Sequence, residues 1–175
     1  SAQPHWKLIS KEILQKSAEQ LNLDPDFLRN VVTDSNRGMM DQIVESLSSH
    51  SFKSDAKILK TIQHVIRQFA EQGSVIIVGR GGAGICSGID KALHVRLDAP
   101  LEWRINEIAT KLEFTKEYAS KFVHEHDKQR EAFISKLYGD KPEVFVYDFV
   151  VNCGHFTPVQ IAEIIYQTAV TKKLF

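Results

Sequence analysis

Apolar residues recur at helical spacing through most of the first half of the chain. This pattern predicts helices over 10–21, from residue 25 onward, over 39–48 and over 54–72. Asp24 is a capping residue followed by Pro25 at the first helical position, and Gly73 is expected to end the fourth helix. The expected buried faces comprise Ile13, Leu14, Ala18 and Leu21; Phe27, Leu28, Val31 and Val32; and Ile58, Leu59, Ile62, Val65, Ile66 and Phe69.

The pattern changes after Gly73, where short apolar runs alternate with helical segments. Strands are predicted over 75–78, 93–97 and 145–151, with a further strand over 5–9. Helices are predicted over 100–112 and 115–137, and a last one starts at Thr157-Pro158. Strands separated by helices indicate an α/β fold with a parallel sheet covered on both faces. Because no repeat or linker marks a boundary, a single domain over 1–175 is expected.

Composition narrows the possible functions. The 175 residues are 43% hydrophobic and 25% charged, as in ordinary soluble domains. Lys+Arg 22 balances Asp+Glu 22, which argues against a protein that mainly binds nucleic acid or an anionic membrane. No apolar run is long enough to span a bilayer, and the N-terminus does not resemble a secretion signal. Cys86 and Cys153 cannot form a disulfide framework, so we expect reduced thiols and a cytoplasmic location.

A glycine-rich segment follows the 75–78 run. Gly79, Gly81 and Gly84 have the G-x-G-x-x-G spacing of a dinucleotide-binding loop, but residues 85–91 are too few for the crossover helix that such a site needs. A turn that returns the chain to the sheet explains the glycines without a ligand. It does not explain Arg80, a charged residue at the carboxyl end of a buried strand, where open α/β sheets bind ligands. Arg80 is therefore expected to bind an anion rather than to form a structural ion pair.

Three stretches, in order along the chain, resemble the cytidylate kinase-like family of nucleoside monophosphate kinases. They are 75–81; 95–105; and Asp127-Lys128-Gln129-Arg130 followed by 147–152 and the helix from Thr157. The segment 5–14 is also similar, with Ser10-Lys11-Glu12 where the family usually has Asp-Lys-Glu. The resemblance covers nearly the whole chain and implies a three-layer α/β/α P-loop kinase-like fold. It implies a helical acceptor-binding region over about 10–72, core strands over about 75–98 and 145–152, and a lid-like helical region over about 113–141.

The resemblance implies transfer of the γ-phosphoryl group of ATP to a nucleoside monophosphate, CMP or dCMP, with Mg²⁺ arriving with ATP. Arg80 resembles the arginine that binds the acceptor phosphate. Asp127, Lys128 and Arg130 resemble lid residues that close over both phosphates, which makes Lys128 and Arg130 candidate ligands of ATP. Without the resemblance, this cluster would be interpreted as a solvated helix surface. Asp127 and Arg130 share a helix face, so the carboxylate is expected to hold that guanidinium.

Other charged residues lie outside these stretches or have a different expected role. Lys11 and Lys16 stand where the family's acceptor-binding segment begins its helix, and they are candidate substrate-binding residues. Arg104 is expected to be the structural partner of an acid rather than a ligand. No structural metal site is expected at His124 and His126, because residues two apart on a helix point about 200° apart.

The chain departs from the family pattern in two places. It contains neither G-x-x-x-x-G-K-[ST] nor a loop similar to Gly-Ser-Gly-Gly, and the strand before that loop is central in the family's sheet. We expect a natural segment before Ser1 to carry the loop; a second copy or a swapped segment is the alternative way to complete the sheet. Gly81-Gly82 also stands where cytidylate kinases carry Asp, which puts CMP in question as the acceptor. A non-catalytic nucleotide-binding or regulatory module remains the alternative function, and an oxidoreductase is a third.

Overall fold

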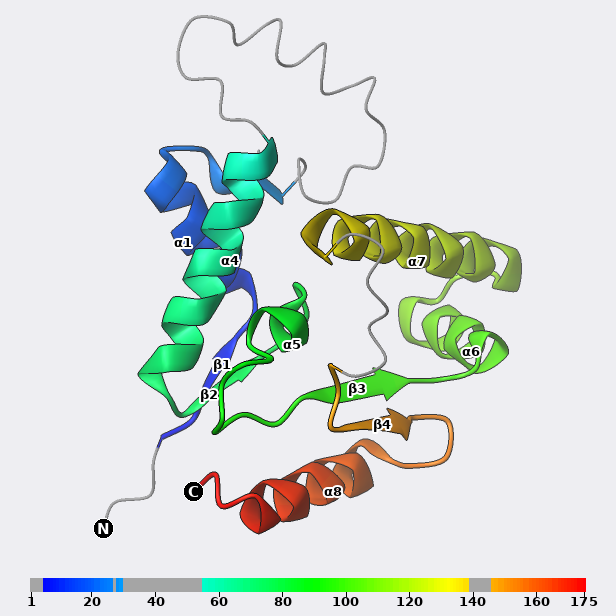
Figure 1. Cartoon of the computed structure of the whole chain (residues 1–175). Helices are drawn as coiled ribbons and strands as arrows, with labels where there is room; N and C mark the ends of the chain where they lie inside the picture. The colour runs from blue at the N-terminus through cyan, green and yellow to red at the C-terminus, as the bar shows by residue number, and fades with distance from the viewer. Residues whose placement is uncertain (1–4, 27, 30–54, 139–145) are drawn as a thin grey trace, which may run out of the picture. The chain divides into compact units, whose positions relative to one another are not determined.

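The computed structural model describes residues 5–26, 28–29, 55–138 and 146–175. Within these ranges the chain is a mixed α/β structure (Figure 1). Its elements are β1 (Lys7–Ile9), α1 (Lys11–Leu21), α4 (Asp55–Gln72), β2 (Val75–Ile77), α5 (Gly82–Ile85), β3 (Val95–Asp98), α6 (Leu101–Leu112), α7 (Lys116–Tyr138), β4 (Phe149–Asn152) and α8 (Pro158–Thr171). The helix expected over 39–48, and the expected core residues Phe27, Val31 and Val32, lie outside the described residues.

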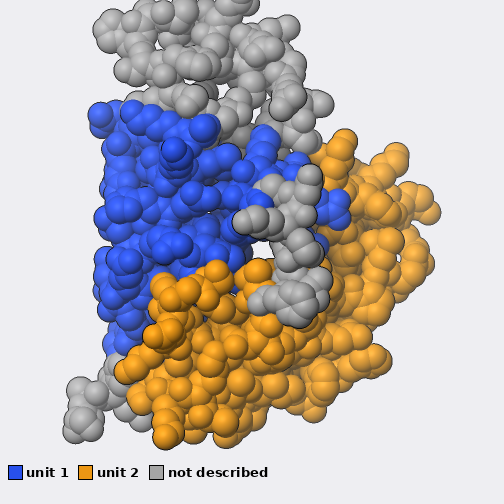
Figure 2. All heavy atoms as spheres, viewed as in Figure 1, with its two compact units in different colours: residues 1–86, 129–139 blue, residues 87–128, 140–175 orange. Residues whose placement is uncertain are grey.

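The chain divides into two compact units (Figure 2). The first unit comprises residues 1–86 and 129–139, and the second comprises 87–128 and 140–175. Helix α7 contributes its residues up to Lys128 to the second unit and its remaining turns to the first. The expectation of a single domain over 1–175 stays a prediction.

In the first unit, two strands pair in parallel beside two packed helices. Lys7 lies opposite Val75 and Ile9 opposite Ile77, so β1 and β2 run in the same direction. Helix α1 packs against α4, as the apolar spacing of both segments predicts. Gly73, with φ +72°, follows the last turn of α4 as predicted. The buried apolar side chains of α1 and α4 are Ile13, Leu14, Ala18, Leu21, Ile58, Ile62, Val65 and Ile66.

In the second unit, β3 and β4 also pair in parallel, with Val95 opposite Phe149 and Asp98 opposite Asn152. The prediction of parallel strands is thus confirmed. The four described strands nevertheless form two separate two-stranded sheets rather than one, because β1 pairs with β2 and β3 with β4, and no described strand joins the pairs. Strands β3 and β4 are shorter than the predicted runs.

The second unit also contains α6, the first part of α7, and α8. Helices α6 and α7 share a buried cluster of Ile105, Ala119 and Val123. Helix α8 begins with a capping box, in which the Thr157 hydroxyl accepts from the Gln160 amide and the Gln160 side chain accepts from the Thr157 amide. This confirms the start predicted from Thr157-Pro158. Both cysteines of the chain are free thiols.

A single carboxylate ties the C-terminal end of α8 to the start of β3. Asp148 accepts the His94 amide at 2.7 Å and the Lys172 ammonium at 2.8 Å, and Lys172 also donates to the Ala92 carbonyl at 2.9 Å. Burial alone would raise the pKa of the Asp148 carboxyl. The hydrogen bonds from His94 and Lys172 and their positive charges outweigh burial and hold that pKa below its ordinary value.

Replacing this carboxylate should therefore remove an acid-sensitive part of the stability. Because the native pKa of Asp148 is lowered, its contribution is complete above the unfolded pKa of about 4 and is lost as pH falls through the native pKa. We expect Asp148→Asn to lower the free energy of unfolding at pH 7 by about 1 to 2 kcal/mol, allowing for its partial exposure. The exposed Asp90→Asn is the matched control. Urea unfolding at pH 7 and pH 3 measures the free energy of unfolding of both variants. An Asp148→Asn variant that loses the same free energy at the two pH values would contradict this role.

Candidate functional site

The segment after β2 is a left-handed turn centred on Arg80. Gly79, Arg80 and Gly81 have φ values of +72°, +54° and +69°, a conformation that is unfavourable for Arg80 because it carries a Cβ. The Gly82 amide donates to the Gly79 carbonyl at 3.0 Å, which closes the turn. Helix α5 then runs only over Gly82–Ile85. So short a helix is not the crossover helix of a dinucleotide site, in agreement with the preference for a turn.

The side chain of Arg80 is half-buried, and no hydrogen bond or ion pair joins it to another described residue. Burial lowers the pKa of its guanidinium, and the positive charge of Arg29 lowers it further. Arg29 itself pairs with Asp26 at 2.6 Å. An arginine stays charged at physiological pH despite such a shift. A partly desolvated cation without a carboxylate partner in the described ranges is suited to bind an anion, as the sequence predicts for Arg80.

The parallel pairing of β1 and β2 brings a second cation to the carboxyl end of the same two strands. The Val78 amide donates to the Ile9 carbonyl at 3.0 Å, so the two strands end side by side. Lys11 starts α1 directly beyond β1, and Arg80 lies directly beyond β2. Lys16 is placed differently, because its ammonium lies 4.9 Å from the centre of the Phe69 ring on α4.

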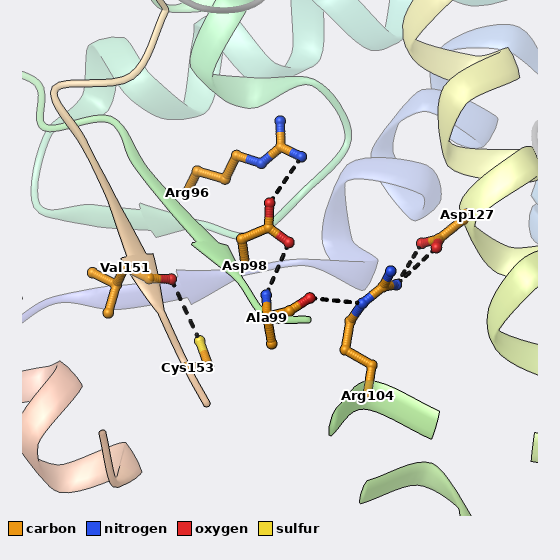
Figure 3. A network of polar contacts seen from close by, with 7 residues as sticks. All are labelled: Arg96, Asp98, Ala99, Arg104, Asp127, Val151 and Cys153. Atoms are coloured by element: carbon orange, nitrogen blue, oxygen red, sulfur yellow. Dashed lines mark hydrogen bonds and ion pairs between the residues drawn. The ribbon is translucent and has the colours of Figure 1, made fainter. Parts of the chain in front are cut away.

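Asp127 has a different partner from the expected one. Both of its carboxylate oxygens accept from Nη1 of Arg104 at 2.8 Å, where a pair with Arg130 was expected (Figure 3). Nε of Arg104 donates to the Ala99 carbonyl at 3.2 Å, which aims the guanidinium from α6 at α7. The interpretation of Arg104 as the structural partner of an acid is thus confirmed. Arg104 and Asp127 also line an open groove of about 310 Å³ on the α6–α7 hairpin.

The other two lid residues are exposed on α7. Neither Lys128 nor Arg130 forms an ion pair with another described residue. Lys128 belongs to the second unit and Arg130 to the first. Their roles at ATP stay predictions.

Sequence analysis missed an ion pair at the carboxyl end of β3. Arg96 lies 3.2 Å from the carboxylate of Asp98, and the same carboxylate accepts the Ala99 amide at 2.9 Å (Figure 3). The carbonyl of Asp98 accepts the Cys153 amide at 2.7 Å, which extends the connection to β4. The signal was present in Val95-Arg96-Leu97-Asp98, because residues two apart on a strand share a face.

The Arg80 turn is also contacted from the end of α7. The Tyr138 hydroxyl donates a hydrogen bond to the Gly81 carbonyl. A Cβ added at Gly81 would lie 2.6 Å from the Tyr138 hydroxyl oxygen and 2.7 Å from Cδ1 of Leu137, whereas one at Gly79 would meet nothing within 4 Å. At Gly81 both the backbone conformation and this contact favour glycine, and at Gly79 the conformation alone favours it.

Alanine substitutions at these two glycines should separate the two requirements. Gly79→Ala is expected to lower the free energy of unfolding by about 1 to 2 kcal/mol through the left-handed conformation alone. Gly81→Ala should cost about 1 to 3 kcal/mol more, because its methyl group overlaps Tyr138 and Leu137. Chemical denaturation of both variants measures the difference. Equal losses would contradict the close approach of α7 to the turn.

Two observations limit the chemistry of the described residues. Within the described ranges, no three His, Cys, Asp or Glu side chains gather where they could hold a metal ion. None of the helices described here has the length and apolar character needed to cross a membrane.

Comparison with known proteins extends the interpretation of these residues. The uronate isomerase of Corynebacterium glutamicum is 25% identical over 132 residues, which cover 75% of this chain and 25% of that protein. The chain thus spans about a quarter of the length of this curated relative. So partial a match does not assign the activity of that protein to this chain. A model of the cytidylate kinase-like family matches residues 2–155, a range that includes Lys11, Arg80 and the whole of α7. With most of its length matched, the chain belongs to the cytidylate kinase-like family.

Proposed function

We propose that this chain binds the acceptor of a nucleotide kinase reaction, a nucleoside monophosphate such as CMP or dCMP, in a three-layer α/β/α P-loop kinase-like fold. The observation that carries the proposal is Arg80. Its half-buried guanidinium lies at the carboxyl end of a parallel strand and has no carboxylate partner among the described residues. Membership of the family supports a nucleotide as the ligand.

The chemistry of a phosphate monoester matches this position. A guanidinium donates two parallel hydrogen bonds to one phosphate, and the negative charge of the ester offsets the desolvation of Arg80. Lys11 supplies a second positive charge at the same edge of the β1–β2 sheet. In phosphoryl transfer, such cations hold the acceptor in position and neutralise its charge. In this proposal, Lys16 contributes by stabilising the packing of α1 against α4 through its contact with Phe69.

ATP with its Mg²⁺ is the co-substrate in this proposal. The 175 residues contain no phosphate-binding loop motif, and the described ones contain no cluster of carboxylates for the metal. The chain's own candidates for contact with the donor phosphates are Lys128 and Arg130, which are exposed on α7. Asp127 contributes by tying α7 to α6 through Arg104. In this proposal, the loop is supplied from outside these residues.

The strand pairing supports the proposal that a further strand pairs with the described ones. Each described strand has a strand partner on one side only, and a two-stranded sheet is marginal by itself. On the β1–β2 sheet, the apolar side chains of Leu8 and Ile76 are 65% and 51% exposed. We propose that a segment outside the 175 residues supplies this strand. The alternative, a second copy of the chain, would be recognised in sedimentation experiments as dimer formation that rises with protein concentration.

The absence of the loop motif also supports a second candidate, a non-catalytic module that binds the nucleotide without transferring phosphate. The two candidates differ in the donor. The module should be stabilised by CMP and not by ATP with Mg²⁺. A rise in melting temperature with ATP and Mg²⁺ that Lys128→Ala and Arg130→Ala abolish would instead favour the kinase.

Loss of the Arg80 guanidinium should weaken binding of the phosphate group. We expect Arg80→Ala to raise the Kd for CMP about a hundredfold, on the order of 3 kcal/mol, and to leave binding of cytidine unchanged because cytidine has no phosphate. Arg67→Ala, which removes an exposed arginine on α4 of the same unit, is the matched control. Calorimetric titration measures the Kd for CMP of the wild-type protein and of both variants. A change below threefold in a folded Arg80→Ala protein would remove Arg80 from the site.

A further inference from the structure

The Gly81 carbonyl has two hydrogen-bond donors that come from distant parts of the chain. The Ile85 amide donates to it at 3.1 Å within the short helix α5. The Tyr138 hydroxyl donates from the last residue of α7, 57 positions further along the chain. The peptide group between Gly81 and Gly82, one residue beyond Arg80, therefore accepts two hydrogen bonds, and only the Ile85 donor belongs to the turn and its short helix.

The ring of Tyr138 also packs closely on the turn. A Cβ added at Gly84 would lie 2.6 Å from its Cζ and 2.8 Å from its hydroxyl oxygen, so the ring occupies the space that a side chain at Gly84 would fill. The same side chain thus makes a steric contact in addition to its hydrogen bond with Gly81. Both glycines allow α7 to approach, and Tyr138 is half-buried as a result.

Such a contact matters because the conformation of Arg80 is unfavourable. A residue with a Cβ at φ +54° persists only where its surroundings hold it there. Within the turn, the Gly82 amide and the Ile85 amide provide hydrogen bonds that any short turn could make. Tyr138 adds a bond and a steric contact that depend on tertiary structure. The backbone of this turn sets the direction in which the Arg80 side chain leaves the chain.

We propose that Tyr138 is a positioning residue for phosphate binding, because it holds the Gly81–Gly82 peptide of the turn that carries Arg80 and so aims the guanidinium at the acceptor phosphate. This inference rests on the proposed function. Tyr138 itself does not touch the nucleotide. Its effect depends on the directional fork of arginine, which binds two oxygens only in one orientation. A lysine at position 80 would be a point charge on a flexible stem and would need no such aim.

Binding of CMP to a set of single and double variants tests this role. Tyr138→Phe keeps the ring and removes the hydrogen bond, and we expect it to raise the Kd for CMP about fivefold. Tyr118→Phe, which alters an exposed tyrosine on the same helix, is the matched control and should leave the Kd unchanged. In the Arg80→Lys background, Tyr138→Phe should change the Kd by less than about 1.5-fold, which a merely structural role would not produce.

The outcomes separate this inference from the proposed function. If the wild-type protein binds CMP and Arg80→Ala loses it, but Tyr138→Phe binds like Tyr118→Phe, the positioning role is wrong and the proposed function stands. An equal loss from Tyr138→Phe in the wild-type and in the Arg80→Lys background would also overturn the positioning role. If the wild-type protein binds neither CMP nor dCMP, both fail.

A second measurement uses the wild-type protein, so it does not depend on the folding of a variant. The ring resonances of Tyr138 should shift during titration with CMP, at the Kd measured by calorimetry, while those of Tyr118 stay in place. CMP binding with no shift at Tyr138 would contradict the proposed coupling.

Discussion

An unfavourable left-handed turn holds a positive charge at the carboxyl end of β2, and the function proposed for this chain depends on that arrangement. Arg80 is partly desolvated and has no carboxylate partner among the described residues. Desolvating a charge costs free energy, and so does its φ of +54°. An anion would offset the first cost. A guanidinium can bind a phosphate through two parallel hydrogen bonds, and the family to which the chain belongs favours a phosphate-bearing ligand.

The rest of the first unit supports this turn. The buried helices α1 and α4 provide its apolar core, and the parallel pairing of β1 with β2 places the ends of both strands together. Lys11 then follows one strand and Arg80 the other. The end of α7 closes on the turn through Tyr138, at glycines that leave room for it. In the second unit, single polar side chains connect neighbouring elements: Arg104 links α6 to α7, and Asp148 links β3 to α8.

Most of the regular structure could be predicted from the sequence, because periodicity reports which face of a helix is buried. The helices α1, α4, α6, α7 and α8 and the parallel strands follow from apolar spacing and from caps such as Thr157-Pro158. Strand ends were less accurate. The apolar residues before Val95 and before Phe149 continue the pattern beyond the pairing, so the sequence alone does not show where the hydrogen bonds between strands begin.

Side-chain partners were harder to predict, because they depend on contacts between elements. Asp127 has Arg130 on its own helix face, yet the guanidinium that reaches it comes from α6 and is aimed by the Ala99 carbonyl. Nothing in the sequence links Tyr138 to Gly81. Arg80 could be chosen from its place after an apolar run and between two glycines, without knowledge of any partner. The structure leaves that run, β2, partly exposed rather than buried as expected. The sequence therefore identifies Arg80 as a candidate ligand, which stays a prediction, and does not identify the contact that Tyr138 makes with its turn.

The most direct test is a titration of the protein with CMP, followed by NMR at the side-chain Nε–H groups of its arginines. Binding at the proposed site predicts a saturable shift at Arg80 and at the amides of Gly79 and Gly82, with one common Kd. Arg104, whose guanidinium is held by Asp127 and Ala99, should not move. A well-dispersed spectrum in which Arg80 stays unchanged at saturating CMP would contradict acceptor binding by this chain.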